Sequence, residues 1–282
     1  MKATQKLRQL LARQGVIQAG GVADAGQARL VERVGYPAVY VSGSYVNHTR
    51  GLPDGSLTLS EIAQRLSEIT DRTSLPVIAD ADEGFGGILK IDRTVRMFER
   101  AGVAGLHLED MATKKHGHPM SLEDALVNLQ VAIDARIDPD FVIIARTDAM
   151  APWRTGLSEN LKACEEEAFQ RCLAYCEAGA DLVMPLFGST AWIKKYGPQL
   201  PKPMLLLPPE LSVEELEPYN VKVVIYASSM LTRAHHFMEK QFASWLNQGM
   251  FDATEQDLID RYDANLLVGM KEKEALLAKY GK

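Results

Sequence analysis

Eight short runs of apolar, largely β-branched residues recur along this chain, and a longer amphipathic stretch follows each of them. Several runs are apolar almost throughout, which is typical of parallel strands covered on both faces. The alternation predicts an α/β protein, and eight units without a break in composition predict one (β/α)₈ TIM barrel across residues 1–282. The expected strands are residues 16–19, 38–42, 77–82, 105–110, 141–147, 182–187, 204–207 and 221–226.

Helix boundaries between these runs carry capping signals. Thr58, Ser121 and Ser212 each stand three residues before an acidic residue and ahead of an apolar-periodic stretch. A helix is expected over about residues 4–13, before the first strand. About residues 228–282 form a C-terminal helical extension that the barrel does not need. This extension either packs on a neighbouring subunit or caps its own barrel.

Charge and cysteine content exclude several classes of protein. A net charge of −6 without a long basic block argues against a nucleic-acid surface, and no apolar run of 18 residues predicts a membrane span. Residues 1–14 have scattered charges and do not resemble a secretory signal. The cysteines Cys164, Cys172 and Cys176 fit small buried side chains rather than a redox or zinc motif. We therefore expect a reduced, cytoplasmic protein.

Carboxylates follow three consecutive expected strands. In this fold the active site lies at the carboxyl ends of the strands. Asp80 and Asp82 end one strand, Glu109 and Asp110 the next, and Asp148 the third. Asp80 and Asp82 are two apart and would share one side of a continuing strand. Such carboxylates need a cation, and oxygen-rich ligands suit Mg²⁺ or Mn²⁺, although a single aspartate could instead cap a helix.

Two further features of these strand ends suit an anionic substrate. Arg146 is well shaped to hold a carboxylate, and its alternative role is an internal ion pair with Asp148 or Glu109. The turn Ser42-Gly43-Ser44 ends the second strand, and its backbone N–H groups could bind a carboxylate or an oxyanion.

The loop at residues 111–119 joins the fourth strand to the next helix. It combines cations, histidines and a glycine, which would let it close over a substrate and exclude water. A solvated basic loop is the alternative. Its candidate site residues are Lys114, His116, Gly117 and His118.

Four segments together resemble the isocitrate lyase and phosphoenolpyruvate mutase superfamily, and within it 2-methylisocitrate lyase-like dicarboxylate lyases. They read DADEGFG at 80–86, GLHLED at 105–110, KKHGH at 114–118 and DPDFVIIARTDA at 138–149. The resemblance covers roughly residues 18–234. It implies a Mg²⁺-held enolate and a homotetramer in which a C-terminal helix is exchanged between subunits.

The resemblance also implies roles for individual residues. Asp80 and Asp82 match metal ligands, Glu109 reaches the ion or its waters, and Asp54 lies near the metal site. Arg146 matches the substrate clamp. The turn Ser42, Gly43 and Ser44 matches the one that binds the carboxylate of a 2-oxo acid.

Three departures from the lyase pattern bear on specificity. His116 occupies the position of the cysteine that acts as the lyases' acid, and a histidine can serve as general acid near neutral pH. Leu186 stands where the lyases carry a glutamate, and Leu206 or Leu207 stands where they carry an asparagine. A tricarboxylate would be left poorly paired there. We therefore expect a substrate with one smaller or less polar end, and not methylisocitrate.

The leading hypothesis is a carbon–carbon lyase for a 2-hydroxy or 2-oxo dicarboxylate. Its candidate catalytic residues are His116, Arg146, Lys114 and Glu109, and Leu186 contacts the substrate. Three alternatives remain: an oxaloacetate-type decarboxylase or hydrolase, an enzyme of phosphonopyruvate or phosphoenolpyruvate, and a metal-binding barrel without activity.

Overall fold

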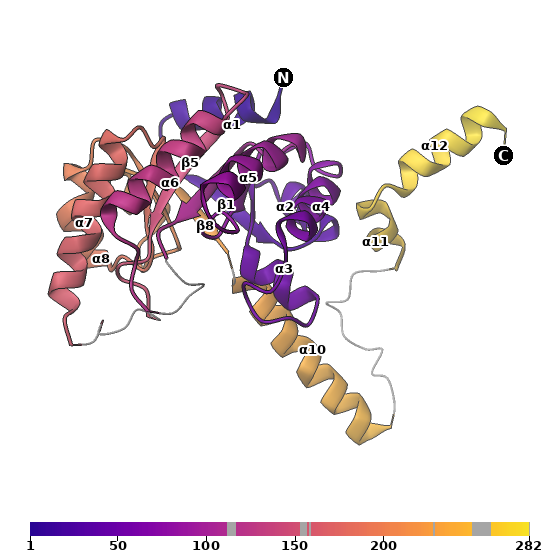
Figure 1. Ribbon diagram of the computed structural model, residues 1–282. Helices are drawn as coiled ribbons and strands as arrows, with labels where there is room; N and C mark the ends of the chain where they lie inside the picture. Colours follow the sequence, from indigo (N-terminus) through magenta and orange to yellow (C-terminus); the bar gives the residue numbers. More distant parts are fainter. Residues whose placement is uncertain (112–116, 153–156, 158, 228, 250–260, 282) are drawn as a thin grey trace.

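A computed structural model describes residues 1–111, 117–152, 157, 159–227, 229–249 and 261–281. Eight parallel strands pair in chain order and close into a barrel, so the predicted fold class is confirmed (Figure 1). The strands expected to end at residues 42, 82, 110, 187 and 207 each end one or two residues earlier, whereas the first strand was expected to end at residue 19 and continues to Val22. The strands are β1 (Ile17–Val22), β2 (Ala38–Val41), β3 (Val77–Asp80), β4 (Gly105–Glu109), β5 (Val142–Thr147), β6 (Leu182–Pro185), β7 (Met204–Leu206) and β8 (Val221–Tyr226).

Helices follow the strands and cover the outside of the barrel. The predicted caps are present: Thr58, Ser121 and Ser212 each accept a hydrogen bond from the amide three residues on, which satisfies an otherwise orphaned donor. The barrel helices are α1 (Ala3–Ala12), α2 (Ala25–Val34), α3 (Gly43–Thr49), α4 (Leu59–Thr70), α5 (Ile88–Arg100), α6 (Leu122–Ala135), α7 (Leu161–Glu177), α8 (Thr190–Tyr196) and α9 (Val213–Leu216), with 3₁₀ turns η1 (Gly197–Gln199) and η2 (Glu217–Tyr219).

Two apolar layers divide the core according to the alternation of side chains along each strand. One layer lies between the strands and the helices and contains Val39, Leu106 and Leu206. The other fills the barrel interior and contains Tyr40 and Met184. Because successive residues of a strand point to opposite faces, this division shows which strand-end residues reach the mouth of the barrel.

Helix α1 closes the amino-terminal end of the barrel. Leu7 is fully buried in the interior layer. The Lys6 ammonium donates to the carbonyl of Ser74, which precedes β3, and Arg8 binds Asp181, which precedes β6, at 2.7 Å. The opposite, carboxyl-terminal end is therefore the one available to a ligand.

The chain continues past the barrel into α10 (Ser229–Gln248), α11 (Arg261–Leu267) and α12 (Met270–Tyr280). Helix α10 leaves the barrel after its first turn and extends away from it (Figure 1). Arg33 of α2 pairs with Asp263 of α11 at 3.0 Å. Among the helices described, none combines the length and the apolar character that a membrane crossing requires.

Candidate active site

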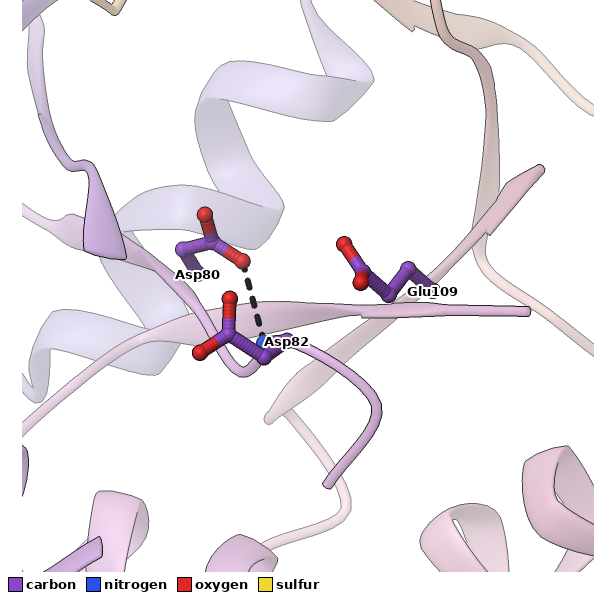
Figure 2. A group of neighbouring side chains, drawn as sticks. All are labelled: Asp80, Asp82 and Glu109. Atoms are coloured by element: carbon purple, nitrogen blue, oxygen red, sulfur yellow. Dashed lines mark hydrogen bonds between the residues drawn. The ribbon is translucent and has the colours of Figure 1, made fainter. Parts of the chain in front are cut away.

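Three carboxylates converge at the carboxyl-terminal mouth of the barrel. Asp80 is the last residue of β3, Asp82 follows it by two, and Glu109 is the last residue of β4. Each offers an oxygen within 4.8 Å of the others, and all three side chains are buried (Figure 2). The sequence prediction of a carboxylate cluster is thus confirmed for these three residues.

The way Asp82 reaches the cluster differs from the prediction. The strand does not continue to Asp82, whose φ of 45° places it in the left-handed region. Aspartate tolerates this conformation better than most residues. Its amide N–H turns back and donates to Oδ1 of Asp80 at 3.0 Å, as the dashed line in Figure 2 shows. A tight turn, and not strand alternation, brings the two carboxylates together.

Gly43 allows the second strand to approach the cluster closely. Its amide donates to Oδ2 of Asp80 at 3.3 Å. A β-carbon at this position would lie 3.3 Å from the same Asp80 oxygen and 3.4 Å from Oδ1 of Asp82. Because a larger residue would crowd both carboxylates, glycine is the residue that suits this turn.

Glu109 indicates that the cluster is built for a cation. Its side chain is almost fully buried, and among the described residues Oε1 has no hydrogen-bond donor. Burial raises the pKa of Glu109 well above its usual range, and the nearby carboxylates Asp148, Asp82 and Asp80 add to this against the opposing effect of Arg146. A divalent ion with a preference for oxygen ligands would supply the missing partner, so the residues fit Mg²⁺ or Mn²⁺.

Tyr40 and His107 form a buried chain behind Asp80, which sequence reasoning did not identify. The Tyr40 hydroxyl and Nε2 of His107 lie 2.8 Å apart, and Nδ1 of His107 lies 3.5 Å from Oδ1 of Asp80. Burial lowers the pKa of His107 to about 4 despite the attraction of Asp80. The imidazole is therefore neutral near pH 7, and protonation on Nδ1 lets it face Asp80 while Nε2 accepts from Tyr40.

Asp80 itself stays ionised. Burial alone would raise the pKa of Asp80. His107, Arg146 and the amides of Asp82 and Gly43 lower this pKa by more than burial raises it, so the net shift is downward. The cluster thus pairs one carboxylate held ionised by its neighbours with another, Glu109, that burial holds toward its neutral form. Binding of a cation would draw both into the ionised state.

Arg146 is held by carboxylates on two sides. Its Nε and Nη2 donate to Asp148 at 2.7 and 2.9 Å, and Nη2 lies 2.9 Å from Oε2 of Glu109. Nη1 is 3.8 Å from Oδ1 of Asp80. The two expected roles are therefore compatible: the internal ion pairs fix the guanidinium, and Nη1 is the group left to face a bound carboxylate.

Asp110 does not belong to the mouth, and its expected place there was wrong. It follows Glu109 directly and so points to the opposite face, away from the interior. One of its carboxylate oxygens accepts from the Tyr175 hydroxyl at 2.8 Å and lies 3.2 Å from Arg171, both on α7. It also accepts the amide N–H of Asp148 at 2.9 Å. Asp110 braces the strand that carries Arg146.

The small-residue turn and Asp54 lie on neighbouring segments. Ser42 is buried at the N-cap position of α3, where its side chain makes no capping hydrogen bond, and Ser44 is partly buried one residue beyond Gly43. The side-chain Nδ2 of Asn47 donates to the carbonyl of Gly43 at 2.8 Å, and its side-chain Oδ1 accepts from the backbone amides of residues 56 and 57. Asp54 is partly buried on the segment that Asn47 holds, and it is not one of the three clustered carboxylates.

The structure describes only some of the candidate site residues in the loop at residues 111–119. Lys114 and His116 lie outside the described residues. Gly117 adopts the left-handed conformation with φ of 97°, and His118 is exposed. The base of the loop is closed by a bridge between Met111 and Pro119.

The leucines that depart from the lyase pattern lie at the ends of β6 and β7, across the mouth from the carboxylate cluster. Leu186 is 5% exposed and belongs to the interior layer. Leu206 faces the helices, whereas Leu207 packs against the interior layer, so Leu207 is the one that faces the mouth. Taken together, the site can hold a divalent cation, bind one carboxylate at Arg146 and cover an apolar group.

Comparisons with known proteins agree with this geometry. The family described as phosphoenolpyruvate phosphomutase matches residues 7–246. The 2-methylisocitrate lyase of Salmonella typhimurium is 34% identical over 272 residues, covering 91% of this chain and 88% of that protein. The 2,3-dimethylmalate lyase of Eubacterium barkeri is 41% identical over 192 residues; the match covers 65% of this chain and 63% of that protein's length. A phosphonopyruvate hydrolase in complex with oxalate and Mg²⁺ superposes with a TM-score of 0.88 at 26% identity, over the full length of both chains.

Proposed function

Because this chain belongs to the phosphoenolpyruvate mutase and isocitrate lyase superfamily, we propose that it is a Mg²⁺-dependent carbon–carbon lyase for 2-hydroxy dicarboxylates. The observation that carries the proposal is the buried group of Asp80, Asp82 and Glu109 beside the clamped Arg146. Relatives named as lyases support the reaction type.

The reaction proposed is cleavage between C2 and C3 of the substrate. The C2 hydroxyl gives up its proton to a base, the C2–C3 bond breaks, and C2 becomes the carbonyl of a 2-oxo acid. The electron pair remains on C3, where the adjoining carboxylate delocalises it as an enolate. C3 then takes a proton from an acid, so the proton taken from the hydroxyl is balanced by the one delivered to C3.

Individual residues have distinct tasks in this scheme. Asp80 and Asp82 would hold Mg²⁺ or Mn²⁺, with Glu109 reaching the ion or its waters and Asp54 nearby. The ion, when bound, would stabilise negative charge on the oxygens of the 2-oxo acid. Arg146 would fix a substrate carboxylate through Nη1, the position that its ion pairs leave for it.

The remaining tasks fall to the turn and to the loop. Ser42, Gly43 and Ser44 would bind the carboxylate of the 2-oxo acid. Gly117 and His118 would contact the substrate from the loop. Lys114 and His116 are the candidates for moving protons, with His116 as the donor to C3.

The decisive experiment is to assay the release of pyruvate or glyoxylate from a panel of 2-hydroxy and 2-oxo diacids, with and without Mg²⁺. Metal-dependent release of a 2-oxo acid from a 2-hydroxy diacid is expected. Acetate from oxaloacetate, or phosphate from phosphonopyruvate, without cleavage of any hydroxy acid would replace the lyase by a hydrolase. Calorimetric binding of oxalate with Mg²⁺, without turnover of any compound, would leave a binding module.

The role of His116 has its own test. His116→Ala should lose most turnover while keeping Mg²⁺-dependent binding of oxalate, because only proton delivery is removed. His236→Ala, exposed on α10 and turned away from the face of Met238 and Phe242, is a matched control that should behave as the wild type. Wild-type turnover in His116→Ala would overturn the assignment.

We also propose that the protein is a homotetramer in which α10 packs on a second copy. Met238, Phe242 and Leu246 recur every four residues, so they share one face, and they are 41%, 62% and 84% exposed. An exposed apolar face of this kind is typical of an interface.

The three free, buried cysteines fit a reducing compartment, and we propose that this compartment is the cytoplasm.

Sedimentation velocity tests the assembly. The wild type should sediment as a tetramer, and Phe242→Glu combined with Leu246→Lys should lower the mass. Lys240→Gln, on the opposite face of the same helix, should leave the assembly unchanged. A monomeric wild type would contradict the proposal.

A further inference from the structure

The barrel mouth is divided into a charged half and an apolar half. The strands β2 to β5 direct Tyr40, Asp80, His107, Glu109 and Arg146 toward the interior. The strands β6 to β8 direct only apolar side chains there among the described residues, namely Leu182, Met184, Leu186, Leu205, Leu207, Val223, Ile225 and Ala227. The change is abrupt on one side, because Arg146 and Met184 are paired in register on adjacent strands.

Among the described strands, only β2 to β5 direct positive charge toward the interior. Arg146 is the one arginine or lysine side chain that the described strands place there. Arg146 already makes two hydrogen bonds to Asp148 and a close contact with Glu109. With a divalent cation in the carboxylate group, the site can neutralise two substrate carboxylates. A third one would find no partner on these strands.

The second half has the opposite preference. Leu186 and Met184 are at least nineteen-twentieths buried, and Ala227 is 8% exposed, so the wall they form is dry and closely packed. A carboxylate pressed against such a wall loses its hydration without gaining a hydrogen bond, which is costly. A methyl group placed there is transferred out of water and gains free energy. The wall therefore favours an apolar group of the substrate over a carboxylate.

We propose that the substrate is an alkyl-substituted malate without a third carboxylate, and that Leu186 and Leu207 select the alkyl group. The inference rests on the proposed lyase function and deepens it. Leu186 continues from β6, where its amide donates to the carbonyl of Thr147 at 3.0 Å, so its position is fixed relative to β5. Leu207 extends β7 in the same interior layer. The two side chains thus stand across the mouth from the carboxylate group.

Two compounds separate alkyl from carboxylate recognition. 2,3-Dimethylmalate and 2-methylisocitrate are identical around C2 and differ only at C3, where the first carries a methyl group and the second a carboxymethyl group. Cleavage yields pyruvate from both, with propanoate or succinate as the second product. The full-length protein with Mg²⁺ should show a kcat/KM at least about a hundredfold higher for 2,3-dimethylmalate, because the unpaired carboxylate opposes binding of the other compound.

Variants place the preference on the two leucines. Leu186→Gln and Leu207→Asn supply amide donors to the wall, and each should shift the ratio of kcat/KM values toward 2-methylisocitrate by roughly tenfold or more. Leu186→Met keeps the wall apolar and should leave the ratio near that of the wild type. Because the ratio is taken within one protein, partial loss of folded enzyme in a variant does not change it.

The outcomes distinguish this inference from the lyase proposal. A wild type that cleaves 2-methylisocitrate at least as well as 2,3-dimethylmalate overturns the apolar selection and leaves the lyase intact. If neither compound is cleaved, calorimetry in the presence of Mg²⁺ decides: tighter binding of 2,3-dimethylmalate supports the selection and rejects the lyase. Equal binding without cleavage overturns both.

Discussion

Asp148 accepts two parallel hydrogen bonds from Arg146 inside the barrel. Nε of Arg146 donates to Oδ1 of Asp148 at 2.7 Å, and Nη2 donates to Oδ2 at 2.9 Å. Both side chains are at least nineteen-twentieths buried. The guanidinium is therefore fixed before a substrate arrives, which lowers the entropic cost of binding a carboxylate.

Replacement of Asp148 should impair substrate binding more than the chemical step. Asp148→Asn removes the negative charge and sets an amide donor against a donor of Arg146, so the guanidinium should lose its orientation. We expect a rise in KM that exceeds the fall in kcat, and destabilisation of about 3 kcal/mol from the broken buried pair. Steady-state kinetics and urea unfolding measure the two effects. Asp134→Asn, on α6, is the control, and an unchanged KM in Asp148→Asn would contradict the positioning role.

Loss of a carboxylate from the cluster should abolish the response to metal. Wild-type protein should gain thermal stability on addition of Mg²⁺ or Mn²⁺, since a ligand that binds only the folded state shifts the melting temperature. Asp82→Asn should show little or no shift, whereas Asp71→Asn, an exposed aspartate after α4, should retain it. Equal shifts in the two variants would place the ion elsewhere.

The hydroxyl of Tyr175 should contribute measurably to stability. It donates to buried Asp110 at 2.8 Å, so Tyr175→Phe leaves a charged acceptor with one partner fewer. The expected loss is about 1–3 kcal/mol in urea unfolding. Tyr280→Phe, on exposed α12, should change stability by less than about 0.5 kcal/mol. An unchanged stability in Tyr175→Phe would mean that Arg171 and the amide of Asp148 satisfy Asp110 without the hydroxyl.

Stability should fall with acidification partly through Glu32. Burial raises the pKa of this carboxylate, but hydrogen bonds from Ser74 and Thr73 and the charge of Arg29 lower it below the ordinary value of 4.5. A carboxylate with a lower pKa in the folded state stabilises the protein above its unfolded pKa, and this is lost as the pH falls through the folded value. Urea midpoints between about pH 6 and about pH 3 should therefore drop more steeply in the wild type than in Glu32→Gln. Parallel curves would rule out this contribution.

The sequence predicts the barrel well because the signal repeats eight times and each apolar run must be covered on both faces. Ends of strands are less predictable. An apolar run gives no sign that β3 stops at Asp80 and that Asp82 turns into the left-handed region, yet this turn forms the cluster. The residues of the cluster were therefore predicted correctly, and the geometry that assembles them was not.

Alternation along the strands also predicts which residues face the interior of the barrel. Tyr40 and His107 stand two residues before Ser42 and Glu109 and so share their face, which would have placed both inside the barrel. The same rule places Asp110 outside. Partners of these side chains remain unpredictable, since the contact of Asp110 with Tyr175 joins residues 65 positions apart.

The two halves of the mouth come from separate stretches of the chain. Residues from β2 to β5 bring the charges, and residues from β6 to β8 bring the apolar wall. Inherited changes in the later stretch can alter which compound is accepted without disturbing the machinery encoded earlier. Directed evolution toward new substrates should accordingly concentrate its libraries on the loops after β6, β7 and β8, and leave the earlier segment untouched.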